Sequence, residues 1–130
     1  MKSDQEIDGK LRDILKEWVN LTTSDSDELT ALHYASFNGD RDCIDLLLQC
    51  GADPRCLSKQ KLSVMHVAAQ NNQAYSLTFF RSILADDCLA EVDSGGMTPL
   101  HWACDNGSDI AILYLLSWIS KSKQHSVINA

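Results

Sequence analysis

Three histidines recur at nearly constant spacing and are the first candidates for chemistry in this sequence. His33 and His66 are 33 residues apart, and His101 follows 35 residues later. Imidazole is a common metal ligand, so histidines aligned by a regular fold could bind a cation such as zinc. No carboxylate or cysteine recurs beside them, although a zinc site draws its remaining ligands from such residues. The sequence therefore predicts no metal site at these positions and no cofactor.

Cysteines and acidic residues are the second set of candidates, in this case for catalysis. The cysteines are Cys43, Cys50, Cys56, Cys88 and Cys104. Their number is odd and no pair has C-x-x-C spacing, so we expect free, mostly buried thiols in a reducing compartment and a cytoplasmic protein. Cys88 falls in an irregular loop, which favours exposure there. The acidic residues read as solvated helix faces and no glycine-rich phosphate loop is present, so we expect no catalytic residue and no enzymatic activity.

Composition and charge narrow the class of protein and of partner. The chain has 130 residues, 45% hydrophobic and 22% charged, which is typical of one soluble globular domain. Its net charge of −7 argues against a nucleic-acid partner and against an anionic membrane surface. The longest apolar run, residues 110–119, is too short to span a bilayer, so direct membrane insertion is not expected. The charged N-terminus has no apolar signal-peptide core, which argues against secretion.

The sequence around each histidine repeats as a unit. The segments are T-A-L-H at 30–33, S-V-M-H at 63–66 and T-P-L-H at 98–101. Each is followed by a small residue, a helix-stopping residue and an apolar cluster at fixed offset. The stops are Gly39, Asn72 and Gly107, and the clusters contain Ile44, Leu47, Leu48, Leu77, Phe80, Ile112, Leu115 and Leu116. Each unit therefore predicts a short helix, a stop and a second amphipathic helix, and stacked units bury each other's apolar faces.

The period of about 33 residues and the T-P-L-H-x-A pattern resemble the ankyrin repeat family over roughly residues 25–120. The resemblance implies an all-α ankyrin-repeat solenoid of stacked helix–turn–helix pairs with short β-turn tips. It also implies a non-catalytic protein–protein interaction module that binds a protein partner on its concave face. In this family the motif Thr or Ser caps the first helix and the His bonds locally. The three histidines are therefore expected to be structural, together with Thr30, Ser63 and Thr98.

The register divides the chain into segments. We expect an N-terminal outer helix, a half repeat or cap, in 1–23, repeat 1 in 24–59 and repeat 2 in 60–92. Repeat 3 without a closing turn should occupy 93–119, and a polar, disordered tail 120–130. Leu11, Ile14 and Leu15 match the first unit's outer helix, so a helix over 6–19 should pack over repeat 1. Two extra residues within 83–93 leave that loop's conformation open.

The concave face would be formed by the tips before each motif and by the exposed side of each first helix. The expected partner-binding residues are Leu29, Tyr34, Phe37, Asn38, Leu62, Gln70, Asn71, Met97, Trp102, Asp105 and Asn106. Apolar anchors ringed by amides are typical of a peptide-binding groove. An alternative stays open: Tyr34 and Trp102 pack between adjacent first helices, and the apolar tip residues fold onto the next tip.

Two further interpretations concern what lies beside this segment. Residues 30–36 and 100–107 are also similar to repeats of ankyrin-bearing acyl-CoA-binding proteins and palmitoyltransferases, which implies a lipid-handling parent whose chemistry lies outside this chain. The last helix, expected at 108–119, is apolar on more than one face and needs cover. That favours a homodimer or a neighbouring domain at the C-terminal end, with structural dimerisation as a third role. The sequence does not identify the partner.

Overall fold

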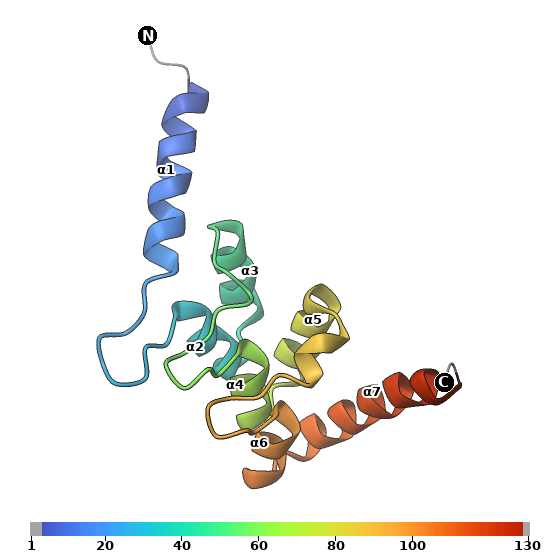
Figure 1. Cartoon of the computed structure of the whole chain (residues 1–130). Helices are drawn as coiled ribbons and strands as arrows, with labels where there is room; N and C mark the ends of the chain where they lie inside the picture. Colours follow the sequence, from blue (N-terminus) through green and yellow to red (C-terminus); the bar gives the residue numbers. More distant parts are fainter. Residues whose placement is uncertain (1–3, 129–130) are drawn as a thin grey trace.

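Three pairs of helices stack side by side and form most of the molecule. The structure is a computed structural model that describes the backbone of residues 4–128 and the side-chain surroundings of residues 9–122. The pairs are α2 (Ala31–Asn38) with α3 (Arg41–Gln49), α4 (Val64–Gln70) with α5 (Ala74–Leu84), and α6 (Pro99–Asp105) with α7 (Asp109–Ile128). The inner helices α2, α4 and α6 lie next to one another, and α3, α5 and α7 form a second row (Figure 1). Residues 4–128 contain no strand, only an isolated antiparallel bridge between Thr22 and Thr30, which confirms the all-α solenoid.

Each inner helix begins at a reciprocal cap built by the repeated motif. The Thr30 Oγ1 accepts a hydrogen bond from the His33 backbone N–H at 3.4 Å, and the Thr30 N–H donates to the His33 Nδ1 at 3.1 Å. Ser63 and His66 repeat this capping box, as do Thr98 and His101 at the start of α6. Two N–H groups that a helix start leaves unpaired are thereby satisfied at each site.

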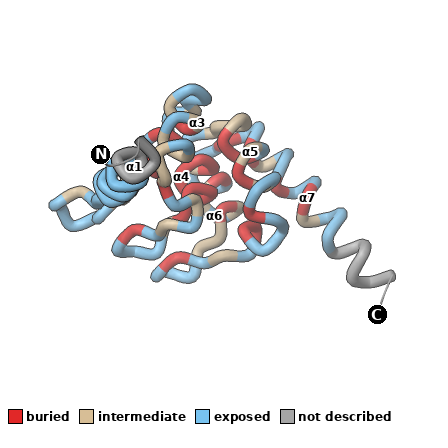
Figure 2. Tube along the Cα trace, turned by 90° about the horizontal axis from the view of Figure 1, so that it is seen from above, coloured by how far each residue is buried: buried red, intermediate tan, exposed pale blue. Residues whose placement is uncertain are grey.

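The core lies between the inner and outer rows. Ile44, Leu77, Phe80 and Leu115 come from the three outer helices and are completely buried. The middle inner helix α4 is buried on most sides, because α2 and α6 flank it and α5 covers it (Figure 2). Burying each such side chain contributes about 1.5–3 kcal/mol, so the apolar clusters of the repeat hold the stack together.

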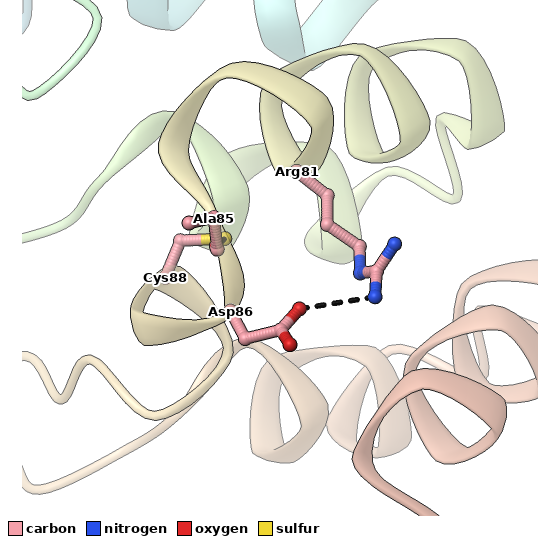
Figure 3. Close-up of polar contacts among 4 residues, drawn as sticks. All are labelled: Arg81, Ala85, Asp86 and Cys88. Carbon is pink, nitrogen blue, oxygen red and sulfur yellow. Dashed lines mark hydrogen bonds and ion pairs between the residues drawn. The ribbon is translucent and has the colours of Figure 1, made fainter. Parts of the chain in front are cut away.

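The irregular loop after α5 forms a 3-10 turn, η1 (Asp86–Leu89), which accommodates the two extra residues. The Arg81 Nη2 lies 3.0 Å from the Asp86 Oδ1, and the Cys88 thiol donates to the Ala85 carbonyl at 3.0 Å (Figure 3). Cys88 is 1% exposed, so the expectation of an exposed thiol was wrong. The turn contacts both α5 and α7 and thereby directs Cys88 and Leu89 into the core.

The N-terminal helix α1 (Asp4–Val19) is present, but apart from Val19 at its end, which packs against the core, it does not pack over repeat 1 as predicted. The side chains of its apolar stripe are exposed, from Leu15 at 46% to Trp18 at 68%, and the helix lies away from the buried core (Figure 2). The Asn20 side chain ties the helix to repeat 1: it donates to the Gly51 carbonyl at 3.0 Å and accepts from the Asp53 N–H at 2.8 Å. Every other outer helix packs on an inner helix of its own unit, and α1 has no such partner within the described residues.

The last helix α7 runs to Ile128, so the predicted disordered tail is wrong for residues 120–128. No glycine or proline follows Ile119 in this segment to stop the helix. Trp118 is 9% exposed and lies under the Arg81 guanidinium, 4.9 Å from carbon to ring centroid, which fixes α7 to α5. The prediction for residues 129–130 lies outside the described residues. None of the helices within 4–128 combines the length and apolar character needed to cross a bilayer.

Candidate functional site

The inner helices and the loop tips line one groove of about 680 Å³ that draws on all three repeats. Its lining residues are Asp27, Leu29, His33, Tyr34, Phe37, Asn38, Gln60, Leu62, Val67, Gln70, Asp93, Ser94, Gly95 and Trp102.

One rim of the groove is formed by three loop tips that are hydrogen-bonded to one another: the first contains Asp27, the second Lys59 and Gln60, and the third Asp93 and Ser94. The Lys59 N–H donates to the Asp27 carbonyl at 3.0 Å, and the Ser94 N–H donates to the Gln60 carbonyl at 2.8 Å. The Gln60 Nε2 also lies 3.5 Å from the Asp27 Oδ1. The two backbone bonds are equivalent, because Lys59 and Ser94 occupy corresponding places in successive tips, as do Asp27 and Gln60, so the rim is continuous across the repeats.

The floor of the groove takes one residue from the same position of each inner helix. These residues are Tyr34, which is 46% exposed, the buried Val67 and the half-buried Trp102. Phe37, also partly exposed, adds a second aromatic ring near the end of α2. The exposure of Tyr34 excludes the alternative that it packs between adjacent inner helices. Trp102 is held in place by its indole N–H, which donates to the Asp93 Oδ2 at 2.8 Å.

Asp93 is a buried carboxylate at the third tip, and it stays ionised. Burial alone would raise the pKa of Asp93, but its hydrogen bonds outweigh burial and hold the pKa below its usual value. The donors are the Met97 and Gly95 backbone N–H groups, both at 2.9 Å, and the Trp102 indole. The carboxylate therefore organises the tip and places a fixed negative charge at one end of the groove.

The structure brings part of the predicted partner-binding set together and leaves part of it apart. The residues that line the groove are Leu29, Tyr34, Phe37, Asn38, Leu62, Gln70 and Trp102. Those that do not are Asn71, Met97, Asp105 and Asn106. The Asn71 Nδ2 donates to the Phe37 carbonyl at 2.8 Å, and the Asn106 Nδ2 donates to the Trp102 carbonyl at 2.9 Å. Both amides are thus engaged with backbone of the inner helices.

Sequence reasoning missed the polar rim. Asp27 and Gln60 each stand two residues before a tip leucine, Leu29 or Leu62, so the repeat register carried a signal for them. Asp93 and Ser94 carried a turn signal only, because periodicity does not show that Asp93 binds the Trp102 indole or that Ser94 bonds to Gln60 of the preceding tip.

The ring nitrogens of His33, which lines the groove, and of His66 are all engaged in hydrogen bonds within the fold. The His33 Nδ1 accepts the Thr30 N–H, and its Nε2 lies 2.8 Å from the Leu62 carbonyl oxygen, so the ring is neutral with its proton on Nε2. The His66 Nε2 lies 2.9 Å from the Met97 carbonyl oxygen in the same way. Burial lowers the pKa of both histidines, although the hydrogen bonds to these carbonyls oppose the shift. Neither ring nitrogen of His33 or His66 is available to a ligand.

A cysteine that sequence reasoning did not single out lies next to a histidine. The Cys56 Sγ is 3.8 Å from the His33 Nδ1 and 3.3 Å from the Thr30 Oγ1. Burial raises the pKa of Cys56, and that of the fully buried Cys88 rises to about 11, so both remain thiols at neutral pH. Because the His33 Nδ1 already accepts the Thr30 N–H, it does not serve as a base for the thiol.

Comparison with known proteins agrees with this geometry. A family model described as ankyrin repeats, in three copies, matches residues 32–125. The chain therefore belongs to the ankyrin-repeat family. Ankyrin repeats are generally protein–protein interaction modules, and their solenoids present an extended concave surface to partners.

The similar curated proteins are much longer than this chain. It is 33% identical over 105 residues to the tyrosine-protein kinase HTK16 of Hydra vulgaris, covering 81% of the chain and 14% of that protein. It is 36% identical over 93 residues to the human transient receptor potential cation channel subfamily A member 1, covering 71% and 8%. It is 29% identical over 96 residues to the palmitoyltransferase AKR1 of Lachancea kluyveri, covering 72% and 13%.

Proposed function

We propose that this chain is a non-catalytic interaction module that binds a partner polypeptide in the groove over α2, α4 and α6. The observation that supports this proposal is the groove itself, which combines an apolar floor with a continuous polar rim across three repeats.

The distribution of side chains in the groove fits a polypeptide ligand. Leu29, Phe37 and Leu62 are large apolar side chains that remain partly exposed there. The amides of Asn38 and Gln70 stand beside them and can bond the backbone of an extended segment. Interfaces draw most of their affinity from a few apolar anchors surrounded by polar groups. Asp105 and Asn106, exposed at the end of α6, extend the proposed contact surface beyond the groove.

The context of the module is a second proposal. Because each relative is several times longer than the matched part, we infer that such a module works beside other domains. The match to a palmitoyltransferase favours a lipid-handling parent, and the matches to a kinase and a channel favour no such context. The lipid-binding, acyl-CoA-binding and cytoplasmic expectations stay predictions.

Self-association is a third candidate, favoured by the exposed apolar face of α7. Leu113 is 70% exposed, and Ile110 and Leu116 are exposed on the same helix. Light scattering at two protein concentrations tests it: a mass that rises with concentration in the wild type, but not in Leu113→Ser, would support a dimer.

Quantitative affinity capture with matched variants tests the main proposal. Phe37→Ala removes a groove side chain, and Leu46→Ala removes an exposed leucine of α3 outside the groove. The wild type and Leu46→Ala should capture the same partner proteins in equal amounts. Phe37→Ala should recover at least about tenfold less of those partners, as expected for a hot-spot residue. Equal recovery by all three proteins, with matching circular dichroism spectra, would contradict the proposal.

A further inference from the structure

We propose that the groove selects an extended peptide segment in which a Lys or Arg side chain stands next to a large apolar side chain. The inference rests on the proposed function and deepens it, because it names the chemistry of the bound segment.

The charged side chains that line the groove are all acidic. Its lining contains the carboxylates of Asp27 and Asp93 but neither lysine nor arginine, and its histidine, His33, is neutral. In the described part of the chain neither carboxylate has a cationic partner, since the ion pair found there joins Arg81 to Asp86. A cation brought by a peptide would therefore meet, at both places, negative charge that no cationic side chain neutralises.

The two carboxylates lie at different tips. Asp27 is exposed on the first tip, and its side chain has one long contact, with the Gln60 Nε2 at 3.5 Å, so it is available to an incoming ammonium or guanidinium group. Lys59 and Lys61, exposed at the second tip, partly offset this charge but do not line the groove.

Asp93 contributes through a different environment, at the third tip. It is buried against the indole of Trp102, and the ring and the carboxylate together favour a cation above them. The negative potential therefore extends from the first repeat to the third, with the apolar side chains between its ends.

The spacing of the floor sets the length of the bound segment. Packed helices lie about 8–10 Å apart, so three inner helices span roughly 20 Å. An extended chain covers that distance in about six residues at ~3.3 Å each. Apolar side chains of the segment would contact Phe37 and Leu62, and its cations would approach Asp27 at one end or Asp93 at the other.

Selection from a random peptide library of about twelve residues, displayed on phage, tests the inference with a defined probe. We expect the enriched peptides to combine Phe, Trp, Leu or Met with Lys or Arg within about six residues. Their affinity, measured by fluorescence anisotropy, should fall as salt rises, because exposed ionic contacts are screened.

Variants of the intact chain then distinguish the contribution of the charge to peptide affinity from that of the apolar groove. Asp27→Asn should weaken binding of the selected peptides about threefold, because it removes an exposed ionic interaction, and Asp27→Lys about tenfold, because it adds repulsion. Asp87→Asn, which removes the same charge from exposed η1 outside the groove, should leave affinity unchanged. Phe37→Ser should weaken binding at least about tenfold.

The outcomes distinguish the two proposals. Apolar peptides without cations, weakened by Phe37→Ser but not by Asp27→Lys, would overturn the inference and leave the proposed function intact. Enriched peptides that bind Phe37→Ser as tightly as the wild type would overturn the proposed function as well. A library that yields no enriched peptide would count against both.

Discussion

The Nε2 of His33 lies 2.8 Å from the carbonyl oxygen of Leu62, so the cap of the first inner helix is bonded directly to the second tip. His66 makes the same link to Met97 at 2.9 Å. Each ring therefore caps its own helix with Nδ1 and holds the next repeat with Nε2. His101 has the equivalent position at the end of the row, is exposed, and has no carbonyl partner for Nε2 within the described residues.

This difference predicts unequal costs for the same substitution. His66→Ala should destabilise the fold by about 2–4 kcal/mol, because it opens a cavity, leaves the buried Ser63 N–H without its acceptor and removes the link to the Met97 carbonyl. His101→Ala should cost about 1 kcal/mol, the loss of a helix cap alone. Urea unfolding at neutral pH measures both, and equal losses would contradict a linking role for His66.

Acid should weaken the fold through His33 and His66 before it protonates Asp93. The pKa of His33 and of His66 in the folded protein lies below the ordinary value of 6.5, chiefly because of burial. Below that value the unfolded chain binds more protons than the folded chain. The stability from the neutral rings is therefore fully present above pH 6.5 and is lost as the pH falls through their folded pKa values.

We expect the urea concentration at the midpoint of unfolding to decrease as the pH is lowered from about 7.5 to about 5.5. The His33 and His66 ring resonances should titrate below pH 6.5 in NMR spectra. The carboxylate of Asp93 would add its own loss only below its ordinary pKa of 3.8, because that pKa is lowered in the fold. A midpoint that is constant or rises over the histidine range would contradict this assignment.

Ala85 has a backbone conformation that favours glycine, at φ 64° and ψ −172°. Such a conformation costs a non-glycine residue about 1–3 kcal/mol. Ala85→Gly removes that strain, but glycine also raises the conformational entropy of the unfolded chain, which costs about 0.5–1 kcal/mol of stability. We therefore expect a net stabilisation of about 1 kcal/mol. The matched control is Ala90→Gly, at φ −103°, which should destabilise the fold slightly. Destabilisation by both substitutions, measured by urea unfolding, would contradict strain at Ala85.

The two ends of the chain should respond differently to loss of a tryptophan. Trp118 is 9% exposed under the Arg81 guanidinium, and Trp118→Ala should cost about 3 kcal/mol. Trp18, 68% exposed on α1, should be replaceable by alanine within about 0.5 kcal/mol. Thermal unfolding of both variants measures the contrast. A comparable loss in Trp18→Ala would mean that α1 packs on the repeats after all.

The repeat pattern predicted the three helix pairs because the same residues that cap each inner helix also set the register of the core. Thr30 and His33 show this directly, since one motif makes the cap and the link to the next tip. The turn at Asp86–Leu89 could not be predicted, because it depends on packing between α5 and α7. The exposure of α1 was missed because its apolar spacing predicts a buried face but not what covers it.

The candidate groove was predicted in its apolar part and missed in its polar part. Leu29, Phe37 and Leu62 follow from the register alone. The rim requires the bond between Gln60 and Ser94, which joins segments that periodicity treats separately. Asn71 was assigned to the partner surface because register places it there, although its amide donates to the Phe37 carbonyl.

Titration of the protein with a selected peptide, followed by backbone amide chemical shifts in NMR spectra, tests whether the groove is the binding site. We expect the amides whose shifts change to cluster at the groove, at Leu29, Phe37, Leu62 and Trp102. Those of the outer helices, such as Leu46 of α3 and Leu113 of α7, should stay in place. Saturable shifts confined to the outer helices, with the groove unperturbed, would contradict a binding role for the groove.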